Sequence, residues 1–62
     1  MKEILKYLRQ TNSLTQDEIA KKINISRQWY IKFEKGLVQP TSEIVKKLSE
    51  FYQVSEDFIY KN

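Results

Sequence analysis

The chain has 62 residues, of which 11 are Lys or Arg and 8 are Asp or Glu, so its formal net charge is +3. A chain of this length makes one small domain and buries only about 60% of the surface that its unfolded form exposes. It contains no Cys and no His, which excludes disulfides and removes the best ligands of zinc and iron sites.

The sequence also restricts the cellular compartment and the binding partners that we expect for this protein. The first residues lack the apolar run of a secretory signal, and no segment approaches the roughly 20 apolar residues that span a bilayer. We therefore expect a cytoplasmic protein with no membrane partner. The modest basic excess favours an anionic partner such as nucleic acid, but it does not establish one.

The single Gly and single Pro leave most of the chain free of helix breakers, which predicts an all-α domain. A first helix is expected over residues 2–10, where Ile4, Leu5 and Leu8 share one apolar face. The segment at residues 11–13, Thr-Asn-Ser, interrupts this pattern. The first helix should therefore end there.

A capping box predicts the start of the second helix. Thr15 is the N-cap and Glu18 follows three residues later, so each side chain satisfies a free backbone donor of the other residue. This helix should stop near Ile23, because Asn24 is one of the few residues that tolerate the left-handed conformation found after many helices.

Three further helices complete the predicted fold. Ser26 should cap a third helix that ends at Gly36, a residue suited to a left-handed stop. A fourth helix is expected over residues 42–52 after Pro40 and Thr41, and a short fifth helix should begin after Ser55. Five helices in 62 residues leave no room for a second domain.

Apolar spacing in the last three helices identifies the expected core. The side chains predicted to point inward are Tyr30 and Phe33 in the third helix, and Ile44, Val45, Leu48 and Phe51 in the fourth. The C-terminal segment holds more aromatic residues than a short helix needs for its own burial. Among these aromatics, Phe51 and Phe58 are expected to be the core members.

The third helix carries a polar sector opposite its apolar face. On a helical wheel with Arg27 at the origin, Ile31 lies at ~40°, Lys35 at ~80°, Gln28 at ~100° and Lys32 at ~140°. Such a cluster is found on many solvated helices. In helix-turn-helix proteins, however, the first turn of the second helix meets base edges, where Arg pairs with guanine, Gln with adenine, and an apolar side chain with the thymine methyl.

Taken together, these motifs resemble the Cro/C1-type helix-turn-helix family, also called the Xre family. The matching residues keep their mutual spacing across essentially the whole chain: Leu5, Leu8, Arg9, Leu14, Thr15, Gln16, Glu18, Ile19, Ala20, Ile25, Ser26, Arg27, Gln28, Glu34, Gly36, Pro40, Val54, Ser55, Asp57, Phe58 and Ile59. The resemblance implies one compact five-helix, lambda-repressor-like DNA-binding domain over residues 1–62, with its helix-turn-helix unit at about 15–35.

The same resemblance implies a function. Proteins of this kind are bacterial, phage or mobile-element transcription regulators, often repressors that bind palindromic operators as dimers, and they need no cofactor. We therefore expect a cytoplasmic, nucleoid-associated, bacterial or phage-encoded protein that binds double-stranded DNA, with residues 26–35 in the major groove. A weak homodimer is expected, because one recognition helix contacts too few base pairs to select a genomic site.

The resemblance also assigns roles to single residues. Base contacts are assigned to Arg27, Gln28 and Lys32, and the helical wheel adds Ile31 to this set. The resemblance assigns a phosphate contact to Gln16, and we also expect phosphate contacts from Ser26, Trp29 and Lys35. A physical reason apart from the resemblance also supports a phosphate contact by Gln16, because a helix N-terminus attracts anions. Arg9 and Glu34 match an ion pair that orients the recognition helix without touching bases.

Two features depart from the family pattern. Leu37 and Val38 stand where family members often carry a basic residue, and they either fold back on the core or join a subunit contact. Trp29 replaces a small or polar residue at the border of the polar sector, where it either packs along the sugar-phosphate wall or is half-buried. Val38, Tyr52 and Tyr60 are the residues that we associate with a small dimer contact.

Other functional classes compete with DNA binding. An enzyme is disfavoured, because the chain has no His or Cys and lacks both a glycine-rich phosphate loop and a plausible carboxylate pair. A protein-interaction module of the same fold, or an antitoxin that binds both DNA and a partner protein, is the alternative. The apolar side chains of Trp29, Leu37 and Val38 favour this alternative, whereas Arg27 and Gln28 argue against it.

Overall fold

Five helices make up the protein in a computed structural model that describes residues 2–60. They are α1 (Lys2–Thr11), α2 (Gln16–Lys22), α3 (Arg27–Lys35), α4 (Ser42–Tyr52) and α5 (Glu56–Tyr60). The described residues contain no strand, so the predicted all-α, five-helix class is confirmed. The remaining three positions of the predicted 1–62 unit lie outside the described residues.

Side-chain caps determine where four of these helices begin, and at α5 the Ser55 hydroxyl accepts a hydrogen bond from the Phe58 backbone N–H at 3.1 Å. At α2, the Thr15 hydroxyl accepts a hydrogen bond from the Glu18 backbone N–H at 3.1 Å, and the Glu18 carboxylate accepts one from the Thr15 N–H at 2.8 Å. Ser26 and Thr41 accept in the same way from the third residue of α3 and α4. The predicted capping box and the predicted Ser26 cap are therefore confirmed.

Left-handed residues end the helices. Asn24, with φ of 63°, follows α2, and Gly36, with φ of 75°, follows α3, as their residue types predicted. Two further left-handed residues, Ser13 and Gln53, follow α1 and α4 with φ of 57° and 58°. They were not expected, because Ser and Gln lack a strong preference for this conformation.

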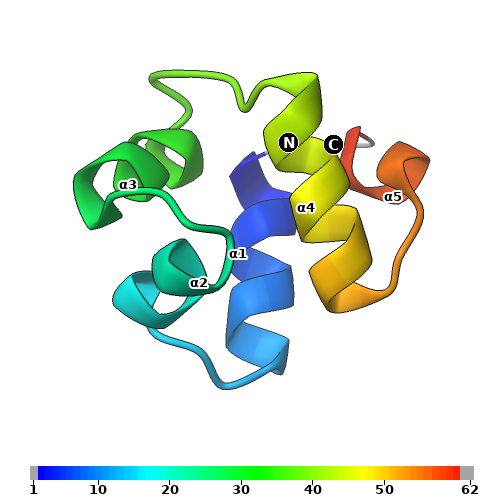
Figure 1. Cartoon of the computed structure of the whole chain (residues 1–62), viewed down its shortest axis with the longest axis horizontal. Helices are drawn as coiled ribbons and strands as arrows, with labels where there is room; N and C mark the ends of the chain where they lie inside the picture. Colours follow the sequence, from blue (N-terminus) through cyan, green and yellow to red (C-terminus); the bar gives the residue numbers. More distant parts are fainter. Residues whose placement is uncertain (1, 61–62) are drawn as a thin grey trace.

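The core is formed by residues from every helix. Its buried members are Leu5, Leu8, Ile19, Ala20, Ile23, Tyr30, Phe33, Ile44, Val45, Leu48 and Ile59. Figure 1 shows α2 and α3 on one side of α1 and α4, with α5 on the other side. The α3 helix packs against both α1 and α2, whereas α5 packs against α4. These contacts hold one face of α3 inward and leave the other exposed.

The expected core role of Phe51 and Phe58 is wrong. Their side chains are 39% and 38% exposed, and Ile59 is the buried residue of α5. The buried face of α4 is instead formed by three aliphatic residues, Ile44, Val45 and Leu48, and the ring of Phe51 lies outside the core. There it meets the neighbouring ring of Tyr52 edge to face, with 5.1 Å between centroids.

Candidate nucleic-acid interface

The tight turn between α2 and α3 sets the position of α3. Ile23 caps α2, and Asn24 then turns the chain in the left-handed conformation. The Ile25 N–H donates back to the Ala20 carbonyl at 2.9 Å, which closes the turn. Ser26 begins α3 immediately afterwards. The two helices are therefore joined by only a few residues, as a helix-turn-helix requires.

The outer face of α3 presents polar side chains at its first turns. Arg27, Gln28 and Lys32 are exposed, as is Lys35 near the end of the helix, and Ile31 among them is half-buried. On the opposite face, Tyr30 is 0% and Phe33 is 2% exposed. The structure thus gathers the predicted base-contacting residues on one side of a helix whose other side is anchored in the core.

A hydrogen-bond network ties α3 to α1 and α2. The Arg9 guanidinium donates to both carboxylate oxygens of Glu34, with Nε to Oε2 at 2.6 Å and Nη2 to Oε1 at 3.2 Å. Gln16 Nε2 donates to Oε1 at 3.2 Å, and the Tyr30 hydroxyl donates to Oε2 at 2.6 Å. The carboxylate therefore accepts four hydrogen bonds, from residues of three different helices.

These contacts account for the shifted pKa values in the network. Burial works to raise the pKa of Glu34, but hydrogen bonds from Arg9, Tyr30 and Gln16 outweigh it, so the pKa lies below its ordinary value of 4.5. The hydrogen bond to Glu34 raises the pKa of Arg9 in turn. Burial, followed by the nearby carboxylate, raises the pKa of Tyr30. The ion pair is thus charged, and Tyr30 is a neutral donor, near pH 7.

The structure brings together Arg9 and Glu34, the pair assigned from the resemblance. It also shows two members of the network that sequence reasoning missed, namely the Tyr30 hydroxyl and the Gln16 amide as donors to Glu34. The i, i+4 spacing of Tyr30 and Glu34 was a signal available in the sequence, since residues at this spacing meet on one helix face. The contact of Gln16 depends on how α2 packs, and no local pattern could have indicated it.

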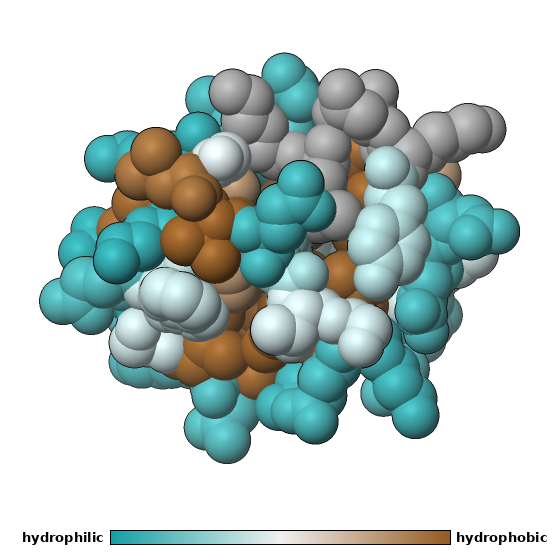
Figure 2. Space-filling view, turned by 90° about the horizontal axis from the view of Figure 1, so that it is seen from above, coloured by the Kyte–Doolittle hydropathy of each residue, from teal (hydrophilic) through white to brown (hydrophobic). Residues whose placement is uncertain are grey.

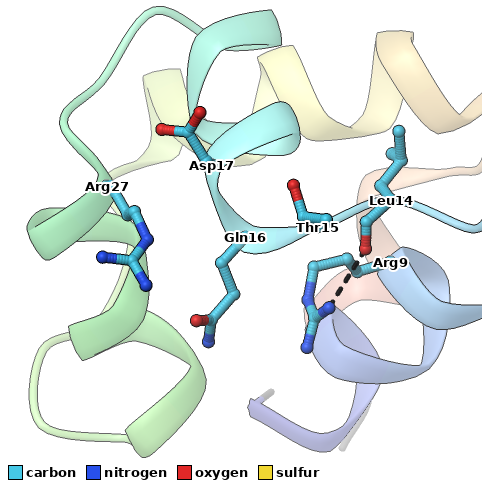
Figure 3. A pocket seen from close by; sticks show the side chains of 6 residues that line it. All are labelled: Arg9, Leu14, Thr15, Gln16, Asp17 and Arg27. Atoms are coloured by element: carbon cyan, nitrogen blue, oxygen red, sulfur yellow. Dashed lines mark hydrogen bonds between the residues drawn. The ribbon is translucent and has the colours of Figure 1, made fainter.

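An open pocket of about 560 Å³ lies beside this network, at the N-terminus of α2. Its lining includes Arg9, Gln16, Asp17 and Arg27. In Figure 3 the Gln16 side chain extends between those of Arg27 and Arg9, whereas the Asp17 carboxylate is turned to the other side. The Arg9 guanidinium is paired with Glu34 and Asp17 also lines the pocket, so an anion such as a phosphate would be attracted mainly by the exposed Arg27 guanidinium.

Trp29 lies at the border between the polar sector and the core. Its side chain is 40% exposed, and its ring meets that of Phe33 edge to face with 5.6 Å between centroids. The Lys32 ammonium lies 5.5 Å from the centroid of the Trp29 ring, which is within cation–π range. Sequence reasoning placed Trp29 at this border but did not anticipate that it would contact Lys32.

The residues that follow α3 and the C-terminal residues have mixed surroundings. Val38 and Tyr52 are half-buried against the core, whereas Leu37 is 69% and Tyr60 is 46% exposed. Figure 2 shows brown hydrophobic surface on the face seen from above, on the side where α3 lies in Figure 1. Of the two interpretations left open for Leu37 and Val38, packing on the core applies to Val38 only.

A family model described as helix-turn-helix matches residues 5–59. The chain belongs to the Cro/C1-type helix-turn-helix family. It is 39% identical over 64 residues to an HTH-type transcriptional regulator of Methanocaldococcus jannaschii, and this match covers all of the chain and 97% of the relative. Proteins of this family are DNA-binding transcription regulators rather than enzymes. The fold and family expected from the sequence are therefore confirmed.

Two other helix-turn-helix relatives come from phage sequences. One is the transcriptional repressor RstR of cryptic phage CTXphi from Vibrio cholerae, 40% identical over 47 residues, which cover 76% of the chain and 42% of the repressor. The other is an HTH-type regulator from prophage SPbeta in Bacillus subtilis, 37% identical over 59 residues, which cover 95% of the chain and 55% of the relative. No solved structure gives a significant match.

Two absences hold within residues 2–60 of the helix-turn-helix chain. No group of three or more Asp or Glu side chains in this range is arranged to hold a metal ion. In the same range, every helix is too short or too polar to cross a bilayer.

Proposed function

We propose that this helix-turn-helix regulator is a repressor that binds a palindromic double-stranded operator as a dimer, with α3 in the major groove. The observation that carries the proposal is the exposed row of Arg27, Gln28 and Lys32 on a helix whose opposite face is buried. A polar face on a rigidly held helix can present its hydrogen-bonding groups to base edges at a fixed depth and angle.

In this proposal, each base contact has a chemical preference. Arg27 favours guanine through O6 and N7, Gln28 favours adenine through N6 and N7, and the Lys32 ammonium favours the acceptors of guanine. Ile31 is half-buried beside them and offers its apolar edge to a thymine methyl. The operator half-site is therefore expected to contain at least one guanine and one adenine.

Phosphate contacts are proposed on both sides of α3. Lys35, Ser26 and Trp29 are exposed along the edges of the helix, where the walls of the groove would lie. Gln16 lines the pocket at the N-terminus of α2, and although its Nε2 is bound to Glu34, its amide lies between two guanidinium groups. A phosphate in this pocket would meet the exposed Arg27 guanidinium, whereas the charge of Arg9 is balanced by Glu34.

Dimerisation is proposed through the segment around α5. Tyr60 is exposed, Tyr52 and Val38 are half-buried, and the Tyr52 hydroxyl is buried without a hydrogen-bond partner among the described residues. A small contact of this kind favours a dimer that forms on DNA rather than in free solution. Two half-sites about one helical turn apart would then be bound by the two copies of α3.

Selection of duplex DNA from a random library with the purified protein tests the proposal. We expect an inverted repeat with half-sites about one turn apart. On that operator, Gln28→Ala should cost about 1–3 kcal/mol at one base pair, whereas Lys35→Ala should weaken specific and random DNA alike and flatten the salt dependence. An unenriched library, or equal losses on operator and random DNA for Gln28→Ala, would contradict sequence-specific binding.

The exposed Leu37 favours a second function, as a module or antitoxin that acts through a partner protein. Its side chain is 69% exposed immediately after the recognition helix, where a basic residue would suit a phosphate better. Under this alternative, Leu37→Lys would strengthen DNA binding but abolish capture of the partner. Under the repressor proposal, the same substitution strengthens DNA binding and leaves regulation intact.

A further inference from the structure

We propose that Trp29 is a positioning residue whose ring directs the Lys32 ammonium toward one base pair, so that base discrimination at this pair depends on an aromatic side chain at position 29. This inference rests on the proposed DNA-binding function. The juxtaposition behind it is a stack of three side chains on α3, in which buried Phe33 holds Trp29 and Trp29 holds Lys32.

The base of this stack is fixed by burial. Phe33 is 2% exposed, and the Trp29 ring meets it at 5.6 Å with an interplanar angle of 68°. This is the edge-to-face arrangement that aromatic pairs favour. Trp29 also supplies the backbone N–H that donates to the Ser26 cap at 3.1 Å, so its main chain is held as well. The ring therefore has a defined place, although 40% of its surface is open to solvent.

The upper part of the stack is a cation over a π-face. The Lys32 Nζ lies 5.5 Å from the Trp29 ring centroid, and Trp is the aromatic side chain that attracts cations most strongly. For an exposed pair, this attraction favours the directed rotamer of Lys32 about two- to fivefold over the others. The ring thus biases the populated position of the ammonium toward its face.

Lysine needs such direction more than its neighbours in the polar sector do. The guanidinium of Arg27 and the amide of Gln28 are planar groups with a built-in bidentate geometry, whereas an ammonium is a point charge on a flexible stem. An undirected Lys32 would gain affinity for any nearby acceptor, phosphate oxygens included. A Lys32 directed by Trp29 gains selectivity for the acceptors that lie where the ring places it.

Position-resolved binding by variants of the full chain tests this inference. The operator from the library selection is changed one base pair at a time, and the base pair at which Lys32→Ala loses discrimination is identified. Trp29→Leu should then lose about two- to fivefold discrimination at that pair alone, and Trp29→Phe should retain most of it because it keeps an aromatic ring. In the Lys32→Ala background, Trp29→Leu should cause no further loss of discrimination there.

The outcomes separate this inference from the wider proposal. Loss of the proposed phosphate contact of Trp29 would lower the affinity for every sequence alike and leave base discrimination unchanged. Unchanged discrimination at the base pair assigned to Lys32 in Trp29→Leu would therefore overturn the positioning role. If the library yields no operator at all, the DNA-binding proposal fails and the inference fails with it.

A measurement without DNA checks the contact itself. In proton NMR of the free protein, the Lys32 side-chain methylene signals nearest the ammonium should be shifted upfield by the ring current of Trp29. The shift should disappear in Trp29→Leu and persist in Trp29→Phe, while the corresponding signals of Lys35 stay unchanged in all variants. Unshifted Lys32 signals in the unmutated protein would overturn the inference, whatever the DNA experiments show.

Discussion

Removal of the Glu34 carboxylate should destabilise the protein severely. In Glu34→Leu, the Arg9 guanidinium keeps only its bond from Nη1 to the Leu14 carbonyl and loses the carboxylate that balances its charge, and the Tyr30 hydroxyl loses its acceptor. The Arg9 side chain is only 14% exposed to solvent. Leaving one charge of a largely buried pair without its partner, together with a buried hydroxyl, is expected to cost about 2–4 kcal/mol.

The size of this loss matters because the whole domain is small. At about 0.05–0.15 kcal/mol per residue, a chain of this length has a total stability of about 3–9 kcal/mol. With a urea dependence of about 1 kcal/mol per M, the unfolding midpoint should fall by about 2–4 M. Urea unfolding followed by far-ultraviolet circular dichroism measures the change directly.

Two further variants make the test specific. Lys21→Ala removes the exposed ion pair between Lys21 and Asp17, whose side chains are 78% and 50% exposed, and it should cost no more than about 0.5 kcal/mol. Combining Glu34→Leu with Arg9→Met should recover part of the stability, because no buried charge is then left unpaired. If the free energy of unfolding of Glu34→Leu lies within about 0.5 kcal/mol of that of the unmutated protein, the network does not stabilise the position of α3.

Three more predictions concern helix ends and pH. Thr15→Ala should lower the free energy of unfolding by about 1 kcal/mol in urea titrations, because it removes a helix cap, and an unchanged midpoint would contradict the capping box. Gly36→Ala should lower the free energy of unfolding by about 1–2 kcal/mol in the same assay, because position 36 has φ of 75° and a side chain with a Cβ disfavours this left-handed conformation. A stabilised variant would show that α3 can end without a left-handed residue. The pKa of Glu34 is lower in the folded than in the unfolded state, so its contribution to the free energy of unfolding should be present above about pH 4.5. This contribution should be lost as the pH falls through the folded-state pKa. Urea titrations of Glu34→Gln should lack this pH dependence.

Local signals predicted most of the helix boundaries. The capping box at Thr15, the cap at Ser26 and the left-handed stops at Asn24 and Gly36 all follow from interactions within a few residues. The left-handed residues Ser13 and Gln53 were missed, because neither side chain favours this conformation.

Predictions of burial were less complete near the C-terminus. Tyr30 and Phe33 are buried as the helical wheel indicated, since the apolar face of α3 is unambiguous. The exposure of Phe51 and Phe58 could not be predicted, because a hydrophobic residue on an apolar face is buried only if another element covers it. Whether α5 covers Phe51 depends on how α5 packs against α4, which spacing within one helix does not specify.

The sequence by itself determined the five helices, the turn between α2 and α3, and the polar sector of the recognition helix, because caps, turns and faces depend on short-range contacts. The tertiary structure alone decided which distant groups meet. Glu34 accepts hydrogen bonds from Arg9 and Gln16 only because packing brings α1 and α2 against α3. Tertiary packing likewise buries Phe33, the residue against which the Trp29 ring packs.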